Sequence, residues 1–431
     1  MKKIEGFTKI AVRGFKSIAK ERTIDIRPLT ILAGANSSGK SSIMQPLLML
    51  KQTLEAPYDP GPLLFDGPNI QFTSAEQFLS KLTSEERAEV FQIRIETLGD
   101  DFSYSVKTTF KQGQNGIELV EMATERQLEA DQSLPPDRFT LYPEMSPEEI
   151  KSLVDQDPFL DILGVNGVIR SRCFLDFESP DDYKPFDLTT NLESNILDSI
   201  HLPRLRDNLE RIHKLTSIGP RYPGIFEHYV ASIIHGWQER TDPRLKTLAD
   251  TLHTLGLTGQ VGTKKIDDTR IELQVGRLRE EQTDETDMVS IADVGFGVSQ
   301  VLPVLVALIV AEPGQLVYLE QPELHLHPRS QSALAQVLAA AAERHVRVVV
   351  ETHSSLLLLG IQTLVAEGDL SPELVKLHWF TQGENGATKI DTEDLDEVGA
   401  YGDWPEDFGD VNLKAQSHYI KASRLRLAER A

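Results

Sequence analysis

The chain has 431 residues, of which 40% are hydrophobic and 26% charged, and its formal net charge at pH 7 is −22. This length allows two or three domains or one large interrupted domain. The acidic balance disfavours nucleic-acid binding over the whole surface, so any DNA contact must be a local patch. The single cysteine excludes a disulfide framework and a cysteine-ligated zinc site, and no stretch is apolar for long enough to span a bilayer. With no apolar signal-peptide core near Met1, we expect a cytoplasmic protein with no membrane partner.

Strand patterns near the start of the chain lead into a phosphate-binding motif. Residues 7–13 and 23–27 alternate in polarity around Gly14-Phe15-Lys16-Ser17-Ile18, and an apolar run follows at 29–33. Residues 34–42 read Gly-Ala-Asn-Ser-Ser-Gly-Lys-Ser-Ser, which fits the pattern G-x-x-x-x-G-K-[ST]. Helical spacing continues over 41–52, so the motif lies between a predicted strand and a predicted helix, as a phosphate loop requires.

The chemistry of such a loop assigns roles to its residues. Gly34 and Gly39 let the main chain approach a ligand closely, and N–H groups at the helix start surround phosphate oxygens. Lys40 would hold the β- and γ-phosphates of ATP, and the Ser41 hydroxyl would ligate Mg²⁺. The other loop residues that we place at the ATP site are Asn36, Ser37, Ser38 and Ser42.

The middle of the chain changes character twice. Residues 90–97, 102–110 and 116–123 predict an antiparallel β lobe, after a short helical piece near 74–82. From 141 to 264, helical periodicity broken by prolines predicts a helical insertion, whose clearest amphipathic helix is 196–215. Basic residues on this helix form either a solvated face or a patch for DNA or a partner: Arg204, Arg206, Arg211 and Lys214.

A second block of chemistry follows the insertion. Strands are predicted at 270–278, 287–292, 346–350, 374–380 and 389–391, with helices at 299–310, 329–343 and 354–367. The buried strand 316–319 ends in Glu320, the arrangement of a Walker B carboxylate that reaches Mg²⁺. Gly297, Ser299 and Gln300 begin a long apolar helix and make a second anion site. Either the chain has a second function at this anion site, or the site binds the nucleotide held by another subunit.

These motifs occur in the order found in ABC-type ATPase heads. Together with Gly-Phe-Lys-Ser-Ile at 14–18, the run Glu-Gln-Pro-Glu-Leu-His-Leu-His-Pro at 320–328 and the strand-end His353, they make the chain resemble the RecF, SMC and OLD group. It is most similar to short OLD-like and RecF-like bacterial AAA ATPases without a fused nuclease domain. The resemblance covers residues 1–125 and 265–410 well and the insertion poorly.

The resemblance implies further roles. Lys16 would approach the phosphates, and Gly297, Ser299 and Gln300 would contact the γ-phosphate held by the opposing protomer. Glu320 stands where the family has its Mg²⁺ aspartate, and His353 would be the switch histidine. Leu326 and His327 fall in the loop that crosses the dimer interface. No clear glutamine loop is found, and Gln71 and Gln77 are its only candidates.

Two departures from the family pattern matter. Gln321 stands where many ABC-type ATPases carry the carboxylate that polarises water, and an amide cannot accept that proton. Either Glu323 substitutes for it or hydrolysis is slow. In OLD nucleases a nuclease domain follows the switch histidine and opens with an apolar strand ending in Glu-Gly. We find no such strand after His353, so we expect any nuclease to be a separate chain. The carboxylates at 391–397 and 403–410 indicate a solvated acidic face. A zinc site at His325 and His327 is disfavoured, because no third and fourth ligands follow at metal-site spacing. Cys173 is expected to pack in the core.

The sequence thus predicts an α/β fold: an ABC-type P-loop ATPase head with a mixed sheet, flanking helices and an antiparallel β lobe. We expect its N-terminal part at 1–140, the helical insertion at 141–264, and the remainder with a helical tail at 265–431. The expected function is a Mg-ATP-dependent ATPase that forms a homodimer around nucleotide and regulates a DNA-associated or nuclease partner in antiphage defence or DNA repair. The alternative is an ATP-loaded scaffold or sensor with vestigial hydrolysis; a transporter ATPase is disfavoured.

Overall fold

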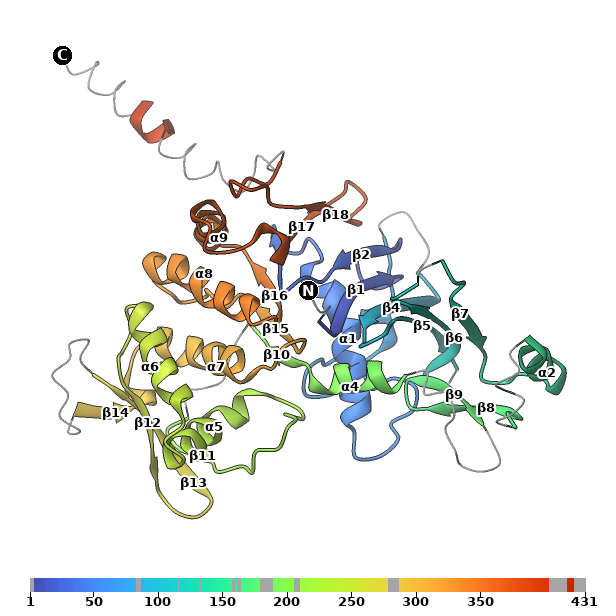
Figure 1. Cartoon of the computed structure of the whole chain (residues 1–431), viewed down its shortest axis with the longest axis horizontal. Helices are drawn as coiled ribbons and strands as arrows, with labels where there is room; N and C mark the ends of the chain where they lie inside the picture. The colour runs from blue at the N-terminus through green and yellow to red at the C-terminus, as the bar shows by residue number, and fades with distance from the viewer. Residues whose placement is uncertain are drawn as a thin grey trace.

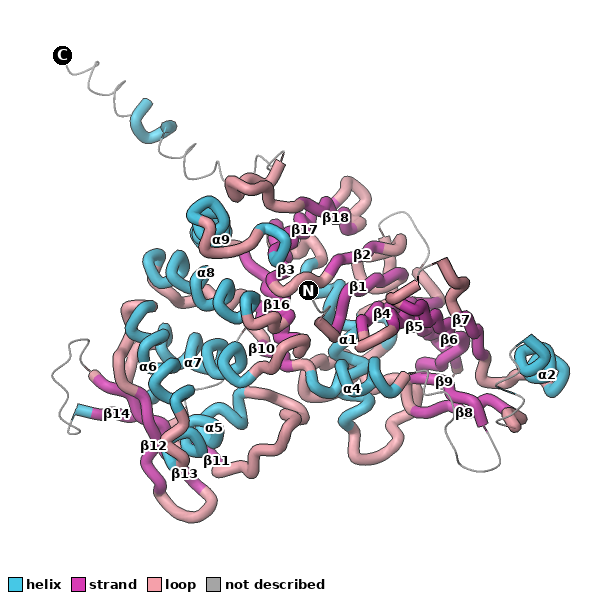
Figure 2. Tube along the Cα trace, in the orientation of Figure 1, coloured by secondary structure: helices cyan, strands magenta, loops and turns pink. Residues whose placement is uncertain are grey.

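Two six-stranded sheets organise the protein (Figures 1 and 2). The computed structural model describes residues 4–82, 87–114, 116–131, 133–156, 160, 164–178, 189–204, 210–277, 287–402 and 417–421. The first sheet is antiparallel, in the order β2 (Arg22–Asp25), β1 (Gly6–Arg13), β4 (Val90–Leu98), β5 (Phe102–Gly113), β6 (Gly116–Leu128) and β7 (Asp137–Leu141). The second has the order β10 (Ile200–Leu202), β15 (Leu316–Glu320), β16 (Arg347–Thr352), β3 (Leu29–Gly34), β17 (Val375–Gln382) and β18 (Thr388–Glu393), and only β18 runs antiparallel to its neighbour.

The second sheet is buried on both faces, which explains why its strands read as continuous apolar runs. In β3, Ile31 packs into one core and Leu32 into the other. The first core holds α5 (Glu227–Glu239), α6 (Pro243–Thr254), α7 (Phe296–Val310), α8 (Pro328–Glu343) and α9 (Ser355–Glu367). The second core joins α1 (Lys40–Glu55) to the antiparallel sheet. The predicted mixed sheet with flanking helices and a β lobe is therefore confirmed.

The middle segment carries strands as well as the expected helices. Besides α5 and α6, the described helices there are α2 (Pro147–Gln156) and α4 (Thr190–Asp198), and the strands are β8 (Gly167–Ser171), β9 (Phe174–Glu178), β10, β11 (His213–Lys214) and β12 (Val261–Lys265). β12 and β11 flank β13 (Arg270–Gly276), which also pairs with β14 (Met288–Ser290). Periodicity alone did not predict the strands because several are too short to show alternation.

The single helix predicted at 196–215 is wrong. Helix α4 ends at Asp198, and Ile200–Leu202 then pairs in parallel with β15. Leu202 is fully buried at that position, so packing on the sheet outweighs local helix propensity. Residues 205–209, including Arg206, lie outside the described residues.

The remaining elements follow the sequence with small shifts. The helical piece expected at 74–82 is only the short 3₁₀ turn Ala75–Gln77, and further 3₁₀ turns lie at Ile291–Asp293 and Pro372–Leu374. The acidic residues at 403–410 lie outside the described residues. Of the expected helical tail the structure describes 417–421, and these residues are helical. Cys173 is buried, as predicted. Among the described helices, none has the length and apolar character needed to cross a bilayer.

His378 connects the two sheets and makes stability depend on pH. It is fully buried on β17, with Nδ1 2.9 Å from Thr392 Oγ1 and Nε2 2.9 Å from the Asp25 carbonyl oxygen of β2. Burial lowers its pKa from 6.5 to about 4, although the adjacent Asp25 opposes the shift. Between these values the unfolded chain binds the proton and the folded chain does not, so this contribution to stability is present above pH 6.5 and is lost as the pH falls towards 4.

We therefore expect the melting temperature to fall more steeply between pH 7 and pH 4.5 in the wild type than in His378→Gln, which has no proton to take up. The variant is less stable at pH 7 because it loses buried hydrogen bonds, but its slope is the informative quantity. Thermal unfolding across this pH range measures both. Parallel pH profiles for the two proteins would contradict this role of His378.

Candidate active site

The phosphate loop joins β3 to α1 at the carboxyl edge of the parallel strands. Gly34 and Gly39 have φ angles of +136° and +104°. A Cβ would lie 2.2 Å from the Phe380 carbonyl oxygen at Gly34, and 2.2 Å from Thr388 Oγ1 at Gly39. The Thr388 hydroxyl donates to the Ser38 carbonyl at 2.9 Å, and this hydrogen bond attaches the loop to β18. Both glycines are thus required by backbone angle and by space.

Residues from both ends of the chain surround one cavity of about 540 Å³ beside this loop. Its lining consists of Lys16, Ser17, Asn36, Ser37, Gly39, Lys40, Ser41, Ser42, Gln45, Arg204, Glu320, Gln321, Glu351 and His353. They meet because β3 lies next to β16, which in turn pairs with β15. The carboxyl ends of parallel strands form the usual ligand edge of such sheets. Most of the candidate residues predicted from sequence therefore share one space.

Lys40 places a positive charge in this cavity. Its side chain is buried, and Nζ donates to the carbonyl oxygens of Gly34 at 3.0 Å and Ala35 at 2.7 Å. Burial lowers its pKa to about 8, while the charges of Glu351 and Glu323 oppose that shift. The ammonium is thus mainly protonated at neutral pH. Burial also lowers the pKa of Lys16, which has a φ of +48° and enters the cavity from the turn after β1.

Two carboxylates on neighbouring strands line the cavity. Glu320 on β15 and Glu351 on β16 are register partners. Ser41 Oγ donates to Glu351 Oε2 at 2.8 Å, and the Tyr318 hydroxyl donates to Glu351 Oε1. Burial, followed by the charge of Glu320, raises the pKa of Glu351. A hydroxyl and two carboxylates are the hard oxygen donors that suit Mg²⁺.

His201 holds Glu320 in place from the edge strand β10. Its Nε2 lies 3.0 Å from Glu320 Oε1, and its ring stacks on Tyr318 with centroids 5.2 Å apart. On the other side, Nδ1 lies 3.3 Å from Asn69 Oδ1. Sequence reasoning missed both His201 and Glu351. Glu351 could have been found, because it lies two residues before His353 at the end of a predicted strand.

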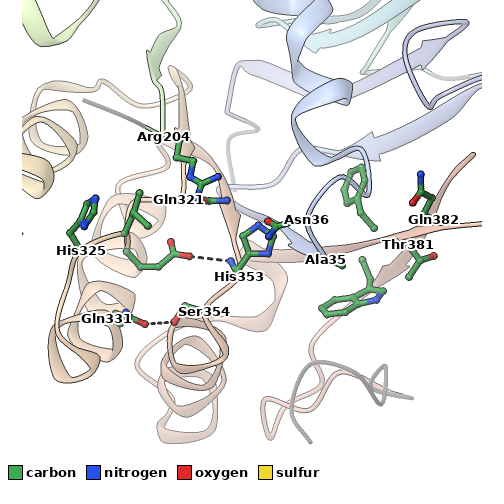
Figure 3. Close-up of a pocket in the computed structure, with 15 residues that line it drawn as sticks. Ala35, Asn36, Arg204, Gln321, His325, Gln331, His353, Ser354, Thr381 and Gln382 are labelled. Atoms are coloured by element: carbon green, nitrogen blue, oxygen red, sulfur yellow. Dashed lines mark hydrogen bonds between the residues drawn. The ribbon is translucent and has the colours of Figure 1, made fainter. Parts of the chain in front are cut away.

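The loop after Glu320 is connected to the strand end that carries His353. Glu323 Oε1 accepts from the Thr352 hydroxyl at 2.7 Å and from the His353 backbone N–H at 3.0 Å. The bond to His353 is drawn as a dashed line in Figure 3. Gln321, with a φ of +46°, donates its backbone N–H to the Glu351 carbonyl at 2.9 Å, and this main-chain bond joins the loop after Glu320 to β16. Burial, followed by the charge of Lys40, lowers the pKa of His353 to about 4, so its imidazole is neutral at physiological pH.

A second cavity of about 830 Å³ adjoins the first and shares Asn36, Arg204, Gln321 and His353 with it. Glu323 lines this second cavity, not the one beside the phosphate loop. Figure 3 shows Arg204 and Gln321 among the residues that line this second cavity. Arg204 therefore enters the candidate active site, whereas Arg211 pairs with Asp293 at 2.6 Å. These two arginines do not form the single basic helix face that the sequence suggested.

Several predicted residues lie away from both cavities. Gly297, Ser299 and Gln300 are in the first turns of α7, where Ser299 is fully buried and its hydroxyl donates to the Phe296 carbonyl at 3.0 Å. Phe296 beside them is 57% exposed. Of the glutamine-loop candidates, Gln71 is exposed and Gln77 donates to Thr73 Oγ1. Neither lines a cavity described here.

The two histidines that the sequence disfavours as zinc ligands have other surroundings. The side chain of His327 caps α8 by accepting from the Arg329 N–H at 3.3 Å. The ring of His325 lies 6.0 Å from that of Phe296, and this contact joins the loop after Glu320 to the start of α7. Within the described residues, no group of three or more His, Cys, Asp or Glu side chains is placed to hold a metal ion.

A comparison with protein families identifies the chain. The sequence pattern of one family matches residues 29–359, a range that includes the phosphate loop, Glu320 and His353, and its description is AAA domain, putative AbiEii toxin, Type IV TA system. The chain belongs to this family. It is thus an AAA-type ATPase domain by family. No curated protein matches the chain in the corresponding comparison.

Solved structures of SMC heads are also similar to this AAA domain, at low sequence identity. An SMC head bound to the C-winged helix domain of ScpA has 11% identity and a TM-score of 0.46, with 91% of this chain and 99% of that chain covered. The SMC head domain from Thermotoga maritima has 11% identity and a TM-score of 0.37, covering 90% and 98%. An SMC head from Pyrococcus furiosus, bound to the C-terminal domain of ScpA, has 12% identity and a TM-score of 0.47, covering 91% and 97%.

Proposed function

We propose that this AAA domain binds and hydrolyses Mg-ATP. The observation that supports this most strongly is the shared cavity in which Lys40 and Ser41 of the phosphate loop face Glu320 and His353. Lys40 supplies the charge for the β- and γ-phosphates, and the loop N–H groups bind the remaining oxygens. Steady-state release of phosphate from ATP by the purified chain tests the proposal, with Lys40→Ala as the inactive reference.

We propose Ser41 and Glu320 as the residues that hold Mg²⁺. The oxygen donors at the base of the cavity fit this ion, and His201 fixes the orientation of Glu320 at 3.0 Å. When bound, Mg²⁺ neutralises phosphate charge and orients the triphosphate. The chain itself fixes the positions of the oxygen donors, because Glu320 and Glu351 are register partners on the paired strands β15 and β16.

The three segments 1–140, 141–264 and 265–431 are proposed to have separate tasks in this site. The first carries Lys40 and the last carries Glu320 and His353, while the middle one delivers His201 and Arg204 at the end of β10. A guanidinium beside Gln321 and His353 can neutralise phosphate charge in the same head. This arrangement gives the middle segment a role in the reaction besides any partner contact.

We further propose that two heads form a homodimer around nucleotide. Gly297, Ser299 and Gln300 lie outside both cavities of their own head, while the start of α7 exposes Phe296. A helix start and an exposed aromatic side chain at one place suit an interface with a second phosphate loop. Leu326 and His327 follow in the loop that packs beside this helix start.

Mixing two inactive variants should restore part of the activity if the site is shared between heads. Gly297→Asp places a negative charge at the helix start, and its new side chain has room because the nearest atom to a Cβ lies at 3.5 Å. Equal amounts of Lys40→Ala and Gly297→Asp give mixed dimers with one intact composite site, so we expect up to about a quarter of wild-type turnover. Absence of recovery in dimers shown by mass spectrometry to be mixed would argue against a shared site.

The partner is proposed to be a nuclease or another DNA-associated protein, in antiphage defence or DNA repair. The family description, with its putative toxin and TA system, supports a defence role and a separately encoded partner. Direct DNA contact is proposed only through local cations, such as Lys214 on β11 and Lys421 near the end of the chain, because the net charge is −22. OLD-like or RecF-like specialisation belongs to this same proposal.

A second function, an ATP-loaded scaffold or sensor with slow hydrolysis, is favoured by one observation. Gln321 lines the cavity where a water-activating carboxylate is usual, and the carboxylate of Glu323 is bonded to Thr352 and His353. An amide does not take a proton from water. If bound ATP is released intact far more often than it is hydrolysed, the sensor is favoured over the enzyme.

A further inference from the structure

Ser41 has a neighbour that the sequence motifs do not assign. Its hydroxyl donates to Glu351 Oε2 at 2.8 Å, across 310 positions of sequence. A hydroxyl has one hydrogen and two lone pairs, so a hydrogen directed to Glu351 leaves the lone pairs pointing elsewhere. Ser41 lines the cavity beside the phosphate loop, and that cavity is where the lone pairs are available. Glu351 thereby decides which side of Ser41 faces the nucleotide.

Glu351 is itself held rigidly. It is 2% exposed, and its other carboxylate oxygen accepts from the hydroxyl of Tyr318, which is 1% exposed. Its main-chain carbonyl accepts from the Gln321 N–H at 2.9 Å, so β15 and β16 fix its position together. A carboxylate fixed in this way can hold the Ser41 hydroxyl in one orientation without losing side-chain freedom when a ligand arrives.

We propose that Glu351 is a positioning residue that directs the Ser41 lone pairs to the metal and, with Glu320, supplies the negative charge of a two-carboxylate Mg²⁺ site. This rests on the proposed Mg-ATP function. The second carboxylate thus comes from β16 inside the sheet.

The test is the Mg²⁺ dependence of nucleotide binding, which does not require hydrolysis. A fluorescent ATP analogue is titrated into each variant in EDTA and at increasing Mg²⁺. We expect Glu351→Gln to need about 10- to 100-fold more Mg²⁺ for half-maximal binding, the usual cost of losing such a supporting group. Affinity in EDTA should match the wild type. Asp394→Asn removes a carboxylate that pairs with Lys376 away from the cavity, and it serves as the matched control.

Two further variants separate orientation from charge. Glu351→Asp keeps the charge but withdraws the carboxylate by one methylene from Ser41, so it should also raise the Mg²⁺ requirement. Ser41→Ala removes the group that Glu351 orients, so adding Glu351→Gln to it should cost much less than Glu351→Gln alone. Melting temperatures show which variants are folded. If Glu351→Gln does not fold, Glu351→Asp tests the proposal.

The outcomes distinguish this proposal from the function on which it rests. Folded Glu351 variants with the wild-type Mg²⁺ requirement would overturn the positioning role alone, as would an equal loss of affinity with and without Mg²⁺. A wild-type protein that binds no ATP, or binds it without any effect of Mg²⁺, would overturn the Mg-ATP function instead.

Discussion

Lys40→Ala is expected to abolish nucleotide binding. The ammonium is the only lysine or arginine charge within residues 34–42, and it is held over the carbonyl oxygens of Gly34 and Ala35. Charged hydrogen bonds each contribute about 1.5–3 kcal/mol, and one ammonium reaches two phosphates. The loss should therefore exceed about 100-fold in affinity, since about 1.4 kcal/mol corresponds to tenfold.

Isothermal titration with ATP and Mg²⁺ measures this effect directly. Lys389→Ala is the matched control, because Lys389 is exposed on β18 and lines neither cavity of the site. We expect the control to bind as the wild type does, and both variants to unfold near the wild-type temperature. Wild-type ATP affinity in folded Lys40→Ala would mean that the phosphate site has been assigned wrongly.

The second large effect is expected at Glu323. Its carboxylate accepts hydrogen bonds from Thr352 and from the His353 backbone, so Glu323→Ala frees the strand end that carries the proposed switch histidine. If Glu323 also takes the proton of the attacking water, general-base assistance adds about 10²–10⁴ in rate. We expect Glu323→Ala to lower turnover by at least about 100-fold, while Gln321→Ala is nearly silent because its bond to Glu351 is made by the main chain.

Glu323→Gln separates the two roles of Glu323. The amide keeps an oxygen that can accept from Thr352 and His353, but it cannot act as a base. Turnover close to the wild type in Glu323→Gln would assign Glu323 to positioning, and turnover as low as in Glu323→Ala would assign it to proton transfer. We expect basal turnover well below about 10 s⁻¹. Fast steady-state turnover that needs Gln321 and ignores Glu323 would contradict this scheme.

The sequence alone was sufficient for features that depend on neighbouring residues. The phosphate loop follows from the order of strand, glycines, lysine and helix, and in the structure residues 35–39 connect β3 to α1. The apolar runs at 29–33 and 316–319 predicted buried strands, and the run at 346–350 predicted a strand. In the structure the side chains of β3, β15 and β16 alternate between two cores. Spacing along the chain carries these signals, so no knowledge of distant contacts was needed.

Only the tertiary structure decided which distant residues meet at the site. The helix predicted at 196–215 gave way to β10, because a place beside β15 buries Ile200 and Leu202 more fully than an isolated helix face would. That exchange brings His201 to Glu320. Likewise, Glu351 contacts Ser41 only because β16 pairs with both β3 and β15. Strand order is set by packing between distant segments, and local periodicity contains no information about it.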